Sequence, residues 1–94
     1  MTGKTTKLNL IEGIFPFSDA REILVSIYKS KINFHQKKNM SSQERFGHLD
    51  ETAEQRIPLL TKNLEQIHEI IKLAETQNKK IHITSSIQID LIDE

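Results

Sequence analysis

The most regular pattern in the chain is a stripe of apolar residues between positions 53 and 74. Its members step alternately by four and three residues: Ala53, Ile57, Leu60, Leu64, Ile67, Ile71 and Ala74. Such spacing puts the side chains on one face of an α-helix. Leu59 and Ile70 widen the stripe, which favours packing inside a globular domain over a free coiled coil. The pattern predicts a helix over residues 51–77, capped by Asp50 and ended by Asn78.

Pro58 interrupts this prediction, because proline lacks the backbone N–H and clashes with the carbonyl four residues earlier in a helix. Two interpretations are open: the helix bends at Pro58, or its regular part begins just before it. The apolar phase runs through Pro58 without a shift. We therefore expect one kinked helix.

A second helical pattern comes earlier in the chain. Ser18 is a good N-cap, and Asp19 and Glu22 put negative charge in the first turn, where the helix dipole favours it. Apolar residues then recur at helical spacing: Ala20, Ile23, Leu24, Ile27, Tyr28 and Ile32. We predict a helix from Ser18 to about Lys38.

The segment between the two helices is polar. Ser41 and Glu44 have the spacing of a capping box, which predicts a short helical turn that Gly47 ends. Phe34 and Phe46 are expected to be buried anchors of this connection.

Alternating patterns at both ends of the chain predict strands. In residues 7–15, Leu8 and Leu10 alternate with polar residues, and Gly13 is expected to mark a bulge. In residues 79–92 one row is largely apolar (Ile81, Ile83, Ser85, Ile87, Ile89, Leu91) and the other is polar (His82, Thr84, Ser86, Gln88, Asp90). Residues 1–6 are expected to be a disordered tail.

These elements predict an α+β fold of order β-α-α-β in a single domain, residues 1–94. A long helical hairpin would pack on a two-stranded antiparallel sheet. Such a sheet is marginally stable in water and leaves a strand edge unpaired. We therefore expect a homodimer that joins two copies through the C-terminal strand into a four-stranded sheet. The alternative is a monomer whose edge is protected by mismatched strand lengths, by Asp93 and Glu94, or by the N-terminal arm.

Composition narrows the function. Thirteen basic and thirteen acidic residues cancel, which disfavours nucleic acid and anionic membranes as partners. The chain has no cysteine, so disulfides, thiolate nucleophiles and cysteine zinc sites are excluded. No apolar run is long enough for a signal peptide or a membrane span, and we expect a cytoplasmic protein without cofactor or metal.

Positive charge is nevertheless concentrated in one region. Five basic residues and one acidic residue give positions 29–46 a net charge of +4. The candidate ligand-binding residues are Lys31, His35, Lys37, Lys38, Arg45 and His48. Arg45 could bind a phosphate or carboxylate with two hydrogen bonds, next to a pH-sensitive His35. The alternative for residues 29–48 is a plain polar connection.

Catalytic signals are weak. Gly3-Lys4-Thr5-Thr6 lacks the upstream glycine and strand of a phosphate-binding loop. His68-Glu69-Ile70-Ile71-Lys72 resembles a zinc-protease motif, but Lys72 occupies the second ligand position. General acid–base chemistry at His35 or His48 would need a carboxylate to orient the ring. We therefore predict no catalytic residue and no enzyme.

Ser30-Lys31-Ile32-Asn33-Phe34-His35 and Glu44-Arg45-Phe46-Gly47 resemble stretches of short uncharacterised bacterial proteins of about this length. That resemblance implies a small stand-alone cytoplasmic protein and brings no activity with it. The function expected from the sequence is a homodimeric structural or protein-interaction module. The alternative is a module that binds a small anion or nucleic acid through the basic 29–48 region.

Overall fold

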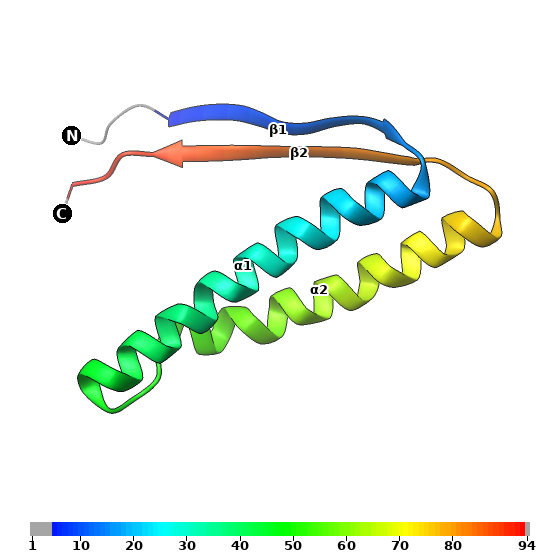
Figure 1. Cartoon of the computed structure of the whole chain (residues 1–94). Helices are drawn as coiled ribbons and strands as arrows, with labels where there is room; N and C mark the ends of the chain where they lie inside the picture. The colour runs from blue at the N-terminus through cyan, green and yellow to red at the C-terminus, as the bar shows by residue number, and fades with distance from the viewer. Residues whose placement is uncertain (1–4, 94) are drawn as a thin grey trace.

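The computed structural model describes residues 5–93 and has the order β-α-α-β, as predicted. Strand β1 (Thr5–Phe15) is followed by helices α1 (Phe17–Phe46) and α2 (Glu51–Thr76) and by strand β2 (Ile81–Asp90). The two strands pair antiparallel. The helices form a hairpin that meets the sheet at one end and diverges from it toward the other (Figure 1). The α+β fold class is therefore confirmed.

β1 begins two residues earlier than predicted. Thr5 and Thr6 pair with Asp90 and Ile89, so they belong to the sheet and not to a tail. The remainder of the predicted tail, residues 1–4, lies outside the described part of the chain. It includes Gly3 and Lys4 of the segment that was compared with a phosphate-binding loop.

The bulge of the sheet lies at Leu10, and its prediction at Gly13 was wrong. Asn9 pairs with Ser86 and Ile11 pairs with Ser85, so Leu10 is the extra residue. Because a bulge changes which residues face the same side, the inner row of β1 continues with Ile11 and no longer includes Leu10. Gly13 pairs regularly, and a Cβ there would lie 3.1 Å from the ring of Phe15.

Helix α1 begins at Phe17, one residue before the predicted cap at Ser18. Pro16 occupies the N-cap position with φ −57°, and its carbonyl accepts a hydrogen bond from the Ala20 N–H at 3.0 Å. Proline suits this place because the N-cap residue has an extended backbone, here with ψ 153°, which the fixed φ of proline allows. Ser18 is therefore an ordinary residue of the first turn.

Helix α1 also continues through the region predicted as a connection. It ends at Phe46, eight residues past Lys38, and the predicted turn at Ser41–Arg45 is its last part. Asn39 and Ser42 are partly buried there. Tertiary contacts outweigh the low helix propensity of such residues. Gly47 ends the helix with φ 75°, as predicted.

Phe34 and Phe46 are more than half exposed, so their prediction as buried anchors was wrong for the single chain. Phe34 lies within the predicted range of α1 and is exposed on its surface, and the extension of α1 places Phe46 on the helix surface as well. The Phe34 ring lies 5.9 Å from the Lys38 ammonium, and the Phe46 ring stacks on His48 at 5.9 Å. Solvated partners therefore take the place of the expected apolar neighbours.

The bounds of helix α2 match their prediction closely. The Asp50 side chain caps it by accepting the Ala53 N–H at 2.9 Å. Pro58 lies inside one continuous helix. At the far end Asn78 is left-handed, with φ 54°. The N–H groups of Asn78 and Lys79 bond to the carbonyls of Glu75 and Ala74. This is the hydrogen-bond pattern of a Schellman motif. The motif includes Lys79, so β2 begins at Ile81 and not at the predicted position 79.

We expect Asp50→Ala to lower the free energy of unfolding by about 1 kcal/mol, because the Ala53 N–H loses its acceptor. Asp50→Asn is the matched control, since asparagine caps about as well as aspartate. Urea denaturation followed by circular dichroism measures both. Equal losses in the two variants would show that the charge of Asp50, and not its cap, stabilises the helix.

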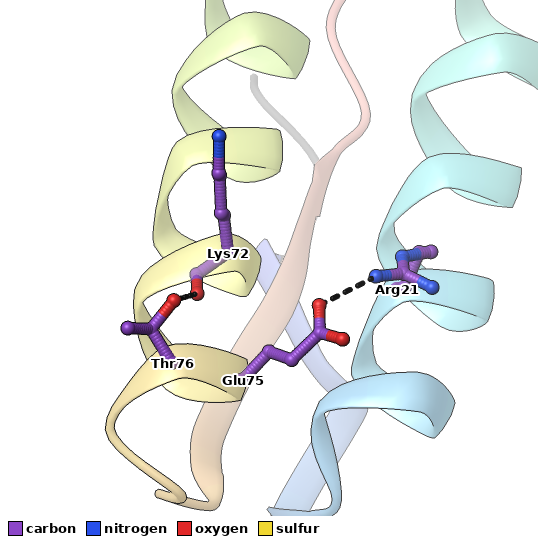
Figure 2. A network of polar contacts seen from close by, with 4 residues as sticks. All are labelled: Arg21, Lys72, Glu75 and Thr76. Atoms are coloured by element: carbon purple, nitrogen blue, oxygen red, sulfur yellow. Dashed lines mark hydrogen bonds and ion pairs between the residues drawn. The ribbon is translucent and has the colours of Figure 1, made fainter.

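At the end where the helices meet the sheet, called the closed end here, an ion pair joins the two helices. Arg21 Nη2 lies 3.7 Å from Glu75 Oε2, and Thr76 Oγ1 donates to the Lys72 carbonyl at 2.8 Å (Figure 2). Both charged side chains are about half exposed, so water screens the pair and its stabilisation is small. Packing, and not charge, holds the hairpin together.

The core of the single chain is small. The apolar row predicted for α1 and the seven-member stripe of α2 are buried or half-buried along their whole length, but Leu59 and Ile70, which were predicted to widen the α2 stripe, are more than half exposed. Among the described residues, only six apolar side chains are buried: Ala20, Ala53, Leu60, Ile71, Ala74 and Ile83. Three of these are alanines, and Ile71 is the one large side chain that is almost completely enclosed, at 1% exposure. A core of this size gives a single chain little stability.

Candidate functional site

The inner face of the sheet is mostly apolar and is left uncovered at one end. Because directly paired residues of an antiparallel sheet share a face, the register places Leu8 beside Ile87, Ile11 beside Ser85 and Thr6 beside Ile89. Near the end where the helices meet the sheet, Ile83 is buried. Farther along, Leu8 is 53% exposed, Ile87 41% and Ile89 45%. These three exposed side chains form an apolar surface. They belong to the parts of β1 and β2 nearest the chain termini, which is the end of the sheet from which the helices diverge (Figure 1).

The overall dimensions agree with an incompletely covered core. The radius of gyration is 16.9 Å, and the principal extents are 49, 35 and 15 Å. A compact domain of this length is expected to have a radius of gyration of about 12 Å. The chain is therefore unusually extended for its length.

A hollow of about 310 Å³ lies where the helices approach the sheet. Leu24, Ile27 and Tyr28 of α1 form one wall, and Ile11 and Ile83 lie on the sheet side. Lys31, one of the candidate ligand-binding residues, also lines it. Sequence reasoning assigned the α1 residues to the core and did not predict a hollow, because the distance between a helix and a sheet has no sequence signal.

The sheet has two edges of different regularity. β1 carries the bulge at Leu10, which breaks the spacing of its outward N–H and C=O groups. β2 runs from Ile81 to Asp90 without an irregularity of its own. An incoming strand needs an evenly spaced row of donors and acceptors. The edge of β2, together with the apolar surface beside it, is therefore the candidate interaction site.

The basic residues lie along α1 and not around one point. Lys31, His35, Lys38 and Arg45 follow helical spacing and share one side of the helix. Lys37 is turned away from this row by about 100°. At about 1.5 Å of rise per residue, Lys31 and Arg45 are separated by about 21 Å along the axis. That row is too long to surround a small anion, and Arg45 and His35 are about 15 Å apart on the same measure.

The histidines of this region contact their neighbours in the chain. The partly buried His35 ring lies 5.3 Å from the Phe34 ring in an edge-on arrangement. His48 follows the end of α1, and its Nδ1–H donates to the Leu49 carbonyl at 3.1 Å. These contacts are structural. They do not provide the carboxylate partner that acid–base chemistry requires.

Asn39 has a role that sequence reasoning missed. Its side-chain oxygen accepts the Asp50 N–H at 3.0 Å, and its Nδ2 donates to Glu54 Oε1 at 3.1 Å. It thereby ties the end of α1 to the start of α2. The partly buried positions Ile32, His35, Asn39 and Ser42 step by three, four and three residues. Polar residues thus continue the apolar stripe of α1 at the same helical spacing. This spacing was the sequence signal that could have predicted the role of Asn39.

In residues 5–93, no three histidine, cysteine, aspartate or glutamate side chains gather closely enough to hold a metal ion. Neither helix of the described chain has the length and apolar character needed to cross a membrane. Comparison with protein-family models, with curated proteins and with solved structures finds no match to this chain.

Proposed function

We propose that this protein is a homodimeric structural or protein-interaction module, assembled through the edge of β2. The observation that carries the proposal is the exposed apolar surface of Leu8, Ile87 and Ile89 beside an unpaired, regular strand edge. Leaving this surface in water gives up hydrophobic stabilisation of about 25 cal/mol per Å². A chain with so small a core has few other sources of stability.

A second copy is the partner that best fits this site. A strand edge requires another strand, and β2 of a second chain provides one with the same apolar inner row. The two-fold arrangement is closed, so neither β2 edge stays available for further pairing. Within residues 5–93, the edges left in the joined sheet are those of β1, where the bulge at Leu10 hinders strand addition.

The basic row on α1 supports the alternative function less well. Its length of about 21 Å spreads the charges too far for one small anion. The aromatic rings available beside it are few, whereas binders of single strands use several rings for stacking. The module proposal therefore assigns no ligand and no catalytic step to α1.

The test is the mass in solution by light scattering across a dilution series, at low and at high salt. We expect twice the chain mass of 10.9 kDa at micromolar concentration, with little effect of salt because the surface is apolar. A mass of 10.9 kDa that persists at high concentration would refute the proposal.

A further inference from the structure

The inner row of β2 reads the same in both directions. From its start it runs Ile81, Ile83, Ser85, Ile87, Ile89, with the one small polar residue at the centre. A strand that pairs antiparallel with its own copy places its start opposite the copy's end. A row symmetric about Ser85 is therefore complementary to itself.

The pleat of the sheet limits the possible registers. Directly opposed residues of an antiparallel pair share a face, so inner residues must meet inner residues. The two-fold axis must then pass between two copies of one residue and not between consecutive residues. Near the middle of β2 the candidates for this central residue are Thr84, Ser85 and Ser86.

Only the register centred on Ser85 matches the whole inner row. It places Ile81 opposite the partner's Ile89, Ile83 opposite the partner's Ile87, and Ser85 opposite the partner's Ser85. Centring on Ser86 would oppose Ser85 to the partner's Ile87. Centring on Thr84 would oppose Ile83 to the partner's Ser85. Both alternatives bring hydroxyls against isoleucines.

The outer row supports the same register independently. Lys80, just before β2, comes to lie opposite the partner's Asp90, and the two-fold axis makes this pair twice. Thr84 meets the partner's Ser86, and His82 meets the partner's Gln88. In the register centred on Ser86, Lys80 would instead face the partner's Ile92. Opposite charges across strands stabilise pairing, so the charges favour Ser85 as the centre.

We propose that two chains join β2 to β2 in the register centred on Ser85, giving a continuous four-stranded sheet. This inference rests on the proposed function and adds the alignment of the interface. The exposed Ile87 then lies between Leu8 of its own chain and the partner's Ile83. Ile89 lies beside the partner's Ile81. In the joined sheet the two helical hairpins cover opposite ends of the same face. The uncovered half of each chain's sheet therefore adjoins the covered half of the other chain's sheet.

Single-cysteine variants test the register, because the chain has no cysteine of its own. Opposed Cα atoms in an antiparallel pair are about 4.5–5.5 Å apart, which a disulfide can bridge. In the Ser85 register, two copies of Ser86 or of Thr84 are offset by two residues along the strands, and their Cα atoms are about 8 Å apart. We expect Ser85→Cys to form a covalent dimer under mild oxidation, and the matched controls Ser86→Cys and Thr84→Cys to stay unlinked.

The outcomes separate the register from the dimer itself. If the unmodified protein has twice the chain mass but Ser86→Cys or Thr84→Cys links in place of Ser85→Cys, the register is wrong and the dimer stands. A dimer in which none of the three variants links uses another surface, and the β2 alignment is overturned. If the unmodified protein is monomeric, the proposed function fails as well.

A charge exchange gives a second test without oxidation. We expect Lys80→Glu and Asp90→Lys each to raise the dimer dissociation constant about tenfold, because each substitution opposes like charges at two symmetric places. The double variant should restore the original constant to within about twofold. If the double variant instead shows the sum of the losses in dimer affinity of the two single variants, Lys80 does not pair with the partner's Asp90.

Discussion

Replacing Ile87 with glutamate is expected to dissociate the protein into single chains. In one chain Ile87 is 41% exposed, so a glutamate there stays hydrated and the monomer loses little. In the proposed dimer the same position lies between Leu8 and the partner's Ile83. A carboxylate buried there without a partner costs several kcal/mol, and the two-fold axis repeats this cost. The dissociation constant should rise by more than about 100-fold.

Light scattering over a dilution series measures this effect. The matched control is Ile14→Glu, which introduces the same charge on an exposed residue of the outer face, opposite His82. The control should keep the mass of the unmodified protein. A dimer that survives Ile87→Glu would show that the inner face of the sheet is not part of the interface.

Replacing Ile71 with alanine is expected to lower the free energy of unfolding by about 2–5 kcal/mol. Ile71 is the large side chain most completely enclosed among the described residues. Because Ile71 is almost completely enclosed, its removal leaves a cavity in the core. Few domains of this size have stability to spare, so the variant should be largely unfolded at moderate temperature.

Urea denaturation at fixed protein concentration measures the loss, since the stability of a dimer depends on concentration. Ile92→Ala is the matched control, because Ile92 is exposed and lies past the end of β2. It should change stability by less than about 0.5 kcal/mol. Comparable losses in both variants would mean that Ile71 is not central to the core.

The parts of the fold that sequence predicted best are those with a local physical cause. Asp50 caps its own helix three residues on, and Gly47 and Asn78 adopt the left-handed conformation that ends a helix. The seven-member stripe of α2 is buried or half-buried throughout. Each of these features depends on residues within a few positions of one another.

The predictions that failed concern features set by distant contacts. The sequence predicts that α1 ends near Lys38, yet the helix continues, and Asn39 is held there by Asp50 and Glu54 at the start of α2. The bulge was assigned to Gly13, whereas the pairing with β2 places it at Leu10. Phe34 and Phe46 were expected to be buried, but both lie exposed on the surface of α1, which continues as far as Phe46.

The candidate site shows the same division. The sequence named six basic or imidazole side chains between positions 31 and 48, and the helical spacing of four of them (Lys31, His35, Lys38 and Arg45) would have shown a row had α1 been extended to Phe46. The edge of β2 was also identified from the sequence, because a two-stranded sheet must have free edges. Which of the two edges is regular depends on the position of the bulge. That position follows only from the residue-by-residue pairing of β1 with β2.

By itself, the sequence determined the order of elements, the ends of α2 and the inner row of β2, since periodicity and caps act over a few residues. Only the tertiary structure decided that the helices diverge from the sheet and leave Leu8, Ile87 and Ile89 exposed. The angle between two packed layers arises from many side chains distant in sequence, and no local pattern encodes it. That divergence is the physical reason for expecting a second chain.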